Sequence, residues 1–309
     1  MKKALKYMLC CAVLCLLISC KNSVTIQAVS KTAGTKTAAA SETKKTGSKK
    51  KKSKKKPKPS KYRGLVTVKG VLYYYDQEGY PLVNKWIRID RYMRRTDDKG
   101  ALRTGLWTVP KSGNTYYFDT EGKLMHGWQK ISGYYYFFRH GSGVMEKNTA
   151  VDGVNLNKKG RAIVDASNSR YLAVYVTARK IAETLTNPSM SNAQRKWACF
   201  QWVMNKPYIN RPGRLPFRNY KGFEIDNAMD ILTGGGGTCF ADASAFAFLA
   251  HALGIKKVSV CTDTGHCWCD INGYIYDPLL YEGWHNTNYY GKIMTGGHHK
   301  AAVRVYIGS

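Results

Sequence analysis

The chain has 309 residues, which is enough for two domains, and a formal net charge of +29. That charge suggests a nucleic-acid-binding protein, but residues 1–61 carry 17 basic side chains and a single acidic one, so about half of the excess lies in one terminal segment. The basic runs of that segment lack the interleaved aromatic residues on which bases stack, so we expect no nucleic-acid partner.

The N-terminus predicts export. Three lysines precede an apolar run from Met8 to Ile18, which is too short to span a bilayer as a mature helix and is typical of a secretory signal. The run ends in Leu-Ile-Ser-Cys and resembles the lipobox of bacterial lipoproteins, which implies lipidation of Cys20 and a membrane anchor. The alternative is an ordinary signal cleaved near Ala28. Both interpretations place the protein outside the cell or in the cell envelope.

Residues 21–61 are predicted to be a disordered linker. They contain thirteen lysines between Lys31 and Lys61 and no hydrophobic periodicity. Such a segment buries too little apolar surface to fold, and its like charges extend it. The lysines are suited to anionic lipid or wall polymers, and the alternative is a solvated spacer.

Residues 62–163 form a repeat with a period of 21 or 22 residues. Each unit contains an aromatic run, an Asp-x-x-Gly turn and a second short run, which predicts a β-hairpin. Tryptophans recur at Trp86, Trp107 and Trp128, and Thr149 stands at the next position. Single hairpins are marginally stable, so we expect the units to stack into a β-hairpin solenoid with a shared aromatic core.

These repeats resemble the cell-wall-binding repeats of choline-binding proteins, most clearly over Gly113–Trp128. The resemblance implies a cell-wall polymer or choline-like ligand, held in cages of aromatic side chains by cation–π attraction. The candidate ligand residues are Trp107, Trp128, Tyr117 and Tyr136. The alternative is that these periodic aromatics only form the core of the solenoid.

Residues 164–309 are predicted to be a second domain that begins with helices. Residues 171–185 are apolar at helical spacing, and Ser191 with Gln194 fits a capping box at the start of another helix. Residues 226–232 are expected to form a short helix before the run Gly234–Gly237. The helix that follows this run is apolar nearly all round, which predicts that it is buried.

Cys239 stands at the start of that buried helix. The unpaired amides and the positive end of the helix dipole favour the thiolate, the nucleophilic form of cysteine. The alternative is that Cys239 is a small buried hydrophobic residue. The predicted exported part has five cysteines, and an odd number indicates at least one free thiol. Their spacing does not fit a metal site, and His298 and His299 are expected at the surface.

A β-hairpin supplies partners for this cysteine. Residues 257–262 are predicted to form a strand, with Gly254 ending the preceding helix. Asn272-Gly273 then lies between two β-rich runs, the strongest short hairpin signal. With these two residues as the loop, His266 and Asp277 point to the same face as diagonal neighbours.

Four motifs resemble the transglutaminase-like core of the papain-like superfamily: Gly-Thr-Cys at Cys239, Leu-Gly-Ile at Gly254, His-Cys-Trp at His266 and Tyr-Asp-Pro at Asp277. The resemblance implies an α+β catalytic domain in which Cys239 is the nucleophile, His266 the base and Asp277 its partner. We expect no cofactor or metal. The Cys239 amide is the expected oxyanion donor, with Trp202 or Tyr208 as candidates for the second.

The resulting hypothesis is an exported cysteine enzyme that acts on amide or peptide bonds of surface proteins or peptidoglycan peptides. Its thioester intermediate passes either to an amine, which cross-links, or to water, which hydrolyses. Both outcomes use the same three residues, so the sequence leaves this choice open. The alternative from another class is a non-catalytic adhesion or scaffold protein that binds the cell wall.

Overall fold

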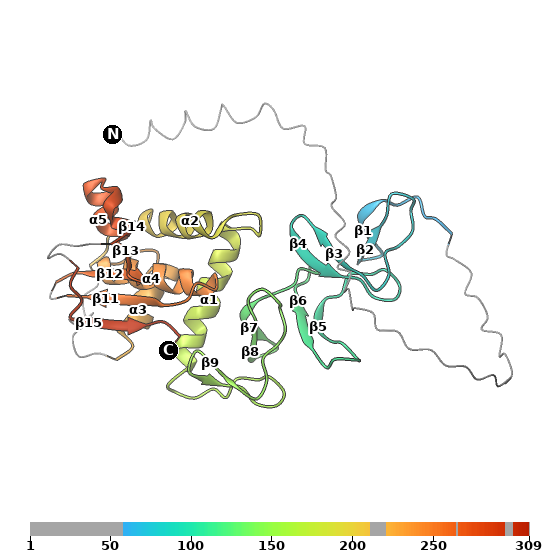
Figure 1. Cartoon of the computed structure of the whole chain (residues 1–309), viewed down its shortest axis with the longest axis horizontal. Helices are drawn as coiled ribbons and strands as arrows, with labels where there is room; N and C mark the ends of the chain where they lie inside the picture. The colour runs from blue at the N-terminus through green and yellow to red at the C-terminus, as the bar shows by residue number, and fades with distance from the viewer. Residues whose placement is uncertain (1–57, 211–220, 264, 294–298, 309) are drawn as a thin grey trace, which may run out of the picture.

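The computed structural model describes residues 58–210, 221–263, 265–293 and 299–308. The signal segment, Cys20 and almost all of the linker lie outside the described residues. Figure 1 shows a row of β-hairpins that leads to a mixed α/β unit at the C-terminal end. Within the described residues, no helix has the length and apolar character needed to cross a bilayer.

The repeat region consists of five antiparallel hairpins, as expected. Their strands are β1 (Gly64–Val68) with β2 (Val71–Tyr75), β3 (Trp86–Ile89) with β4 (Tyr92–Arg95), β5 (Gly105–Thr108) with β6 (Thr115–Phe118), β7 (Gly127–Ile131) with β8 (Tyr134–Phe138), and β9 (Ala150–Val151) with β10 (Val154–Asn155). Each hairpin forms its own two-stranded sheet, so contacts between units hold the row together.

The Asp-x-x-Gly turns explain the period of the repeat. One Asp97 carboxylate oxygen accepts the amides of Lys99 at 2.8 Å and Ala101 at 2.9 Å, which closes the turn. Gly100 has a positive φ of 85°, and a Cβ there would lie 2.6 Å from the Cβ of Pro81 in the preceding unit. The turn therefore requires glycine for its backbone conformation and for the close approach of Pro81 from the preceding unit.

Aromatic contacts join successive units. The rings of Trp86 and Trp107 meet edge to face at 6.2 Å, and Tyr117 stacks on Phe138 at 5.9 Å. Phe118 and Phe138 are fully buried. The periodic aromatics thus serve as the shared core that the sequence predicts.

The C-terminal unit is built around one buried helix. The helices are α1 (Ser169–Leu185), α2 (Asn192–Met204), α3 (Phe223–Leu232), α4 (Cys239–Ala252) and the short α5 (Pro278–Trp284). α4 is buried along almost its whole length, as its composition predicts, and it packs against α1, α2 and α3. The expected capping box of α2 is present, whereas α3 begins at Phe223, three residues before the predicted start.

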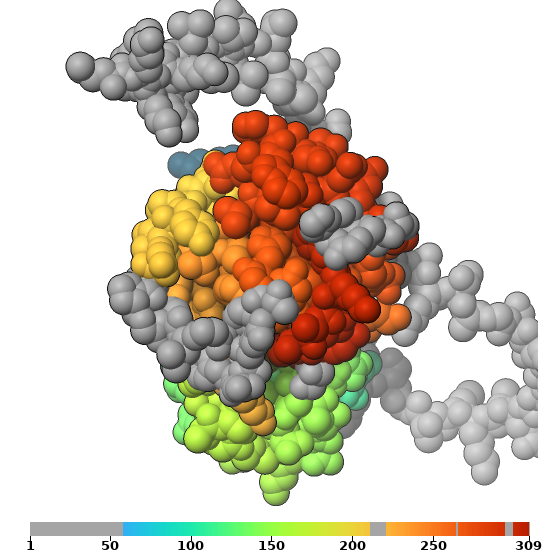
Figure 2. Space-filling view, turned by 90° about the vertical axis from the view of Figure 1, so that its left-hand side faces the viewer, coloured from blue at the N-terminus to red at the C-terminus, as the bar shows by residue number. Residues whose placement is uncertain are grey.

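A five-stranded antiparallel sheet covers α4. Its order is β14 (Tyr290–Lys292), β13 (Tyr274–Tyr276), β12 (Cys267–Ile271), β11 (Val258–Thr262) and β15 (Val303–Tyr306), with the 3₁₀ helix η2 (Thr287–Tyr289) before β14. β11 and β12 are buried at every residue. Figure 2 looks onto this end of the molecule, with α2 in yellow, β15 in red and the region of the last hairpins and α1 in green.

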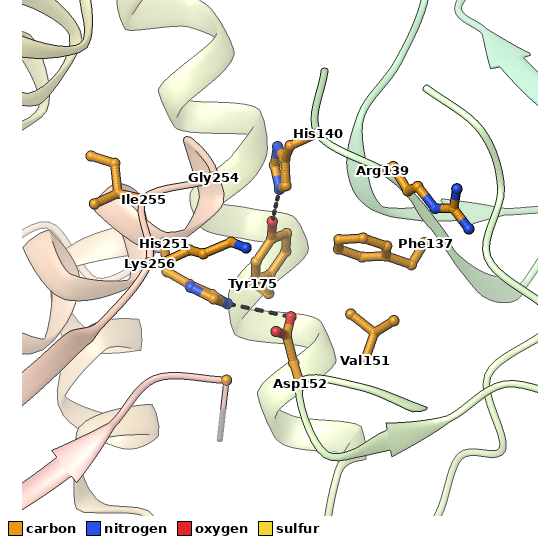
Figure 3. A pocket seen from close by; sticks show the side chains of 11 residues that line it. Phe137, Arg139, His140, Val151, Asp152, Tyr175, His251, Gly254, Ile255 and Lys256 are labelled. Carbon is orange, nitrogen blue, oxygen red and sulfur yellow. Dashed lines mark hydrogen bonds and ion pairs between the residues drawn. The ribbon is translucent and has the colours of Figure 1, made fainter. Parts of the chain in front are cut away.

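The last hairpins dock onto the C-terminal unit through a polar cluster. Trp128 of β7 donates its indole N–H to Asp152 at 2.8 Å, and the same carboxylate lies 3.3 Å from the ring of His251 on α4. Asp152 and His251 line a cavity of about 520 Å³ between the two regions, together with Tyr175 of α1 and Lys256 (Figure 3). The repeats and α4 are therefore in direct contact.

Candidate catalytic centre

Cys239 is the first residue of α4, with Thr238 as the N-cap, so its side chain lies at the positive end of the helix dipole. The residue is 7% exposed, and it therefore lies close to the surface of the core. This position matches the one expected from the glycine run that precedes it.

The glycine run packs against the segment that follows α2. A bridge joins Tyr208 to Gly237, and the amide of Ile209 donates to the carbonyl of Gly237 at 2.9 Å. A Cβ on Gly236 would lie 2.5 Å from the carbonyl oxygen of Pro207, so this approach requires glycine. The close packing fixes the start of α4 and brings Tyr208 to the side of Cys239.

His266 stands immediately before β12, in a loop ordered by Asp263, whose carboxylate accepts the His266 amide at 2.7 Å. The β12–β13 hairpin has the predicted register, with Cys269 opposite Tyr276. Asn272 and Gly273 both have positive φ, as a two-residue type I′ loop requires. The hairpin prediction is confirmed.

Asp277 follows β13 and is the N-cap of α5, where its Oδ1 accepts the Leu280 amide at 3.0 Å. Its Oδ2 lies 2.5 Å from Nε2 of His266, so the predicted pairing of carboxylate and imidazole is present. Asp277 is fully buried. Hydrogen bonds with His266 and His299 outweigh the effect of burial and lower the pKa of Asp277.

His266 joins Asp277 to Cys239. Burial favours the neutral imidazole, but hydrogen bonds to Asp277 and to Cys239 outweigh it and raise the pKa of His266 to about 10. The imidazolium is then the stable form at neutral pH. Because Nε2 is occupied by Asp277, Nδ1 is the nitrogen left to face the sulfur. The three side chains thus lie together in the order thiol, imidazole and carboxylate.

The position of His299 corrects one expectation. We expected this residue at the surface, but its side chain is 2% exposed and its Nε2 lies 2.9 Å from Oδ2 of Asp277. The ring packs edge-on against Trp268 at 4.7 Å. Oδ2 of Asp277 is thus hydrogen-bonded to both histidines. His298 lies outside the described residues.

Asp242 adds an acidic group one turn into α4. It is 8% exposed, and burial together with the charge of Asp277 raises the pKa of Asp242 to about 8. It therefore carries a proton at neutral pH. A neutral Asp242 leaves the positive end of the helix dipole available to the Cys239 sulfur.

The other four cysteines of the described residues are free, buried thiols. Burial raises the pKa of Cys199 to about 12 and that of Cys261 to about 11. These thiols stay protonated and unreactive at neutral pH. Among the described cysteines, Cys239 is the one with a histidine beside it.

His266, Asp277 and His299 are also the described residues whose grouping could hold a metal ion, since their ligand atoms lie within 4.8 Å of one another. Two ligands of one tetrahedral zinc ion lie about 3.3 Å apart, given metal–ligand bonds of about 2.0–2.1 Å. The observed separations of 2.5 and 2.9 Å are hydrogen-bond distances. The donor set fits a histidine–carboxylate network better than a shared ion.

The two oxyanion candidates differ in position. Tyr208 forms a bridge with Gly237, two residues before Cys239. Burial, and then the charges of Cys239 and Asp242, raise the pKa of Tyr208. Trp202 lies on α2 with the ammonium of Lys206 4.0 Å from its ring centre. Tyr208 adjoins the glycine run that leads into Cys239, so it is the better placed of the two.

The four candidate ligand residues of the repeats also differ. Trp128 is fully buried against the C-terminal unit, so its ring is closed to a ligand and the expectation for it is wrong. Tyr136 is 6% exposed, and its hydroxyl accepts a hydrogen bond from Nε of Arg161 at 3.1 Å. Trp107 and Tyr117 are half-buried and stay candidates.

The chain is similar to several known proteins. Residues 104–149 match the choline-binding repeat family. A glucosyltransferase-S of Streptococcus mutans is 28% identical over 139 residues, which are 44% of this chain and 8% of that protein. This chain is also similar to CbpJ (25% identity, TM-score 0.31) and choline-binding protein F (26%, 0.31) of Streptococcus pneumoniae. Each alignment covers 33% of this chain and 34% of the other.

Proposed function

We propose that this protein binds a polymer of the bacterial cell wall through its repeats and carries a cysteine acyl-transfer centre in its C-terminal unit. The binding half is supported by the match of residues 104–149 to the choline-binding repeat family. The catalytic half is supported by one observation, the His266 imidazole paired with the Asp277 carboxylate at 2.5 Å and neighbouring Cys239 at the start of α4.

The geometry suits the following reaction. The Cys239 thiolate attacks the carbonyl carbon of a carboxamide or peptide bond, and the negative oxygen that forms is held by the Cys239 amide and the Tyr208 hydroxyl. His266 donates its proton to the leaving amine as the carbon–nitrogen bond breaks, which leaves a thioester. The neutral imidazole then takes a proton from an incoming amine or water, and the carbonyl re-forms as the thiolate leaves.

A thiol-directed electrophile tests the nucleophile. We expect Cys239 to be labelled in the folded protein faster than any cysteine of the denatured protein, because the imidazolium stabilises its thiolate. A library of glutamine-containing peptides, offered with and without a primary amine, then separates cross-linking from hydrolysis. Labelling no faster than in the denatured protein, with no turnover of the library, would end the enzyme proposal.

A second candidate is a non-catalytic wall-binding adhesion or scaffold protein. The comparisons favour it, because the family match covers repeat residues only. Binding of the full chain to isolated cell walls is common to both candidates. If Cys239→Ala leaves every effect of the protein on wall fragments unchanged, the second candidate is the correct one.

Wall binding has its own test. We expect the full chain to sediment with isolated cell walls and excess free ligand of the repeats to release it. Absence of sedimentation with walls that retain their polymers would remove the targeting proposal, whatever the outcome at Cys239.

A further inference from the structure

The second hairpin departs from its neighbours at the position of Arg95. The carbonyl of Arg95 accepts the amide of Arg103. The carbonyls that play this part belong to Tyr74, Tyr117 and Phe137 in the first, third and fourth units, and to Asn155 in the fifth. An arginine therefore stands where the first, third and fourth units have an aromatic residue. Such a change alters the chemistry of one unit while the hairpin backbone stays the same.

The two arginines lie on the aromatic rings that join the second and third units. The guanidinium carbon of Arg95 is 5.8 Å from the ring centre of Trp86 and 5.3 Å from that of Trp107. The guanidinium of Arg103 lies 4.6 Å from Trp107. Cations already occupy the aromatic surface that a choline headgroup would need.

These arginines lack acidic partners among the described residues. Burial and the positive charge of Arg103 lower the pKa of Arg95. The Nε donor of each arginine is buried without an acceptor, although Nη1 of Arg95 donates to the carbonyl of Asn84 at 2.5 Å. Two like charges with unused donors call for an acceptor that the described protein does not supply.

Other arginines of the repeats have hydrogen-bond acceptors or acidic partners for their guanidinium groups. Arg94 donates to the carbonyls of Ile89 and Glu121 and lies near several carboxylates. Arg139 of the fourth unit is paired with Glu146, which occupies the place that Arg103 has in the second unit. The pair Arg95–Arg103 is thus unlike these neighbours.

We infer that Arg95 and Arg103, set on Trp86 and Trp107, form a subsite for a phosphate group of an anionic wall polymer. A phosphate accepts paired hydrogen bonds from planar guanidinium groups and neutralises both charges. A quaternary ammonium would meet two positive charges in the same place. Trp86 is 37% exposed, so a polymer chain reaches the subsite from solvent. The inference rests on the wall-binding part of the proposed function and specifies its ligand chemistry.

The test uses the full chain and purified poly(glycerol phosphate), with affinity measured by calorimetry at several salt concentrations. Arg95→Gln and Arg103→Gln are each expected to weaken binding about tenfold, as the loss of a charge-assisted hydrogen-bond pair implies. Arg88→Gln is the matched control, an exposed arginine of the same hairpin, and is expected to change affinity by about twofold or less. Arg95→Tyr restores the aromatic residue of other units and is expected to exchange phosphate binding for choline binding.

Three outcomes would overturn the inference. They are an equal loss of affinity in the Arg88 control, equal affinity for a DNA oligonucleotide of the same charge, and displacement of the polymer from the unaltered protein by choline. Because the polymer is purified, a failure of wall binding and a failure of this subsite are measured separately.

Discussion

The hairpin repeats and the C-terminal unit place their functional side chains in opposite ways. In the repeats, each unit presents the same backbone, so a side chain such as Arg95 changes the surface around it, including Trp107 of the next unit, while both hairpins keep their fold. In the C-terminal unit, Cys239, His266 and Asp277 come from the start of a helix, the start of a strand and the cap of another helix.

This difference has a physical consequence. A repeat array has nearly independent units, and it tolerates variation of its ligand chemistry one unit at a time. A site assembled from three elements exists only when the helix, the sheet and their contact have all formed, and removing one member removes the function of all. The predictions below test whether the two regions really differ in this way.

The largest effect is expected at Cys239. Cys239→Ala removes the nucleophile, so the rate of any acyl transfer should fall by about 10⁴-fold or more. Affinity for cell walls should not change, because the variant leaves the repeats intact. Turnover of the peptide library and sedimentation with walls are measured on the same preparation. Retained turnover would show that the chemistry, if any, lies elsewhere.

The second-largest effect is expected at His299, which positions Asp277. His299→Phe removes one of the two side-chain hydrogen bonds that lower the pKa of Asp277, so that pKa should rise. The acid limb of the rate profile should then move to higher pH, and kcat should fall about 10- to 100-fold. Loss of His266 protonation near pH 10 should limit the alkaline side in both proteins.

Two further variants show whether His299 positions Asp277 or only packs. His299→Gln keeps a donor and should recover part of the rate and of the pH profile. His285→Asn alters an exposed histidine and should have no effect. A fall in activity without any movement of the acid limb would contradict the positioning role.

The features that the sequence predicts correctly are those that depend on nearby residues. The capping box at Ser191 and Gln194 and the hairpin loop at Asn272 and Gly273 are decided by residues a few positions apart, and both are present. The joining of Cys239 to the hairpin face follows from the motif order, which the resemblance interprets, rather than from local chemistry. The transglutaminase-like identity of this unit therefore stays a prediction.

The predictions for His299 and Trp128 are wrong for the same reason. No periodicity connects His299 to Asp277, since His299 reaches the site through packing against Trp268 and Tyr289. Trp128 has the spacing of a repeat tryptophan, but its unit lies against α1 and α4 rather than against solvent. In both cases a tertiary neighbour decides the burial, and the sequence pattern around the residue does not contain that neighbour.

Trp128 also provides the third prediction, on the contact between the two regions. Trp128→Phe keeps an aromatic ring but removes the N–H that Asp152 accepts, so the unfolding free energy should fall by about 1.5–3 kcal/mol. Trp86→Phe, at a more exposed repeat tryptophan, is the control and should cost less. Chemical denaturation measures both. An equal loss in the two variants would mean that the junction contributes no more than any other unit.

The smallest effect is expected at Asp242, and it concerns pH. The pKa of Asp242 is about 8 in the folded protein, against 3.8 as its ordinary value. The folded state therefore binds the extra proton between these values, and stability should decline as the pH rises from about 4 to 8 and then level off. Asp242→Asn mimics the protonated side chain and should remove this decline, with little change in rate at neutral pH. Asp98→Asn, in an exposed turn of the repeats, should keep it. Unfolding free energies across that range decide the matter, because a decline that persists in Asp242→Asn would show that Asp242 is already ionised beside Asp277.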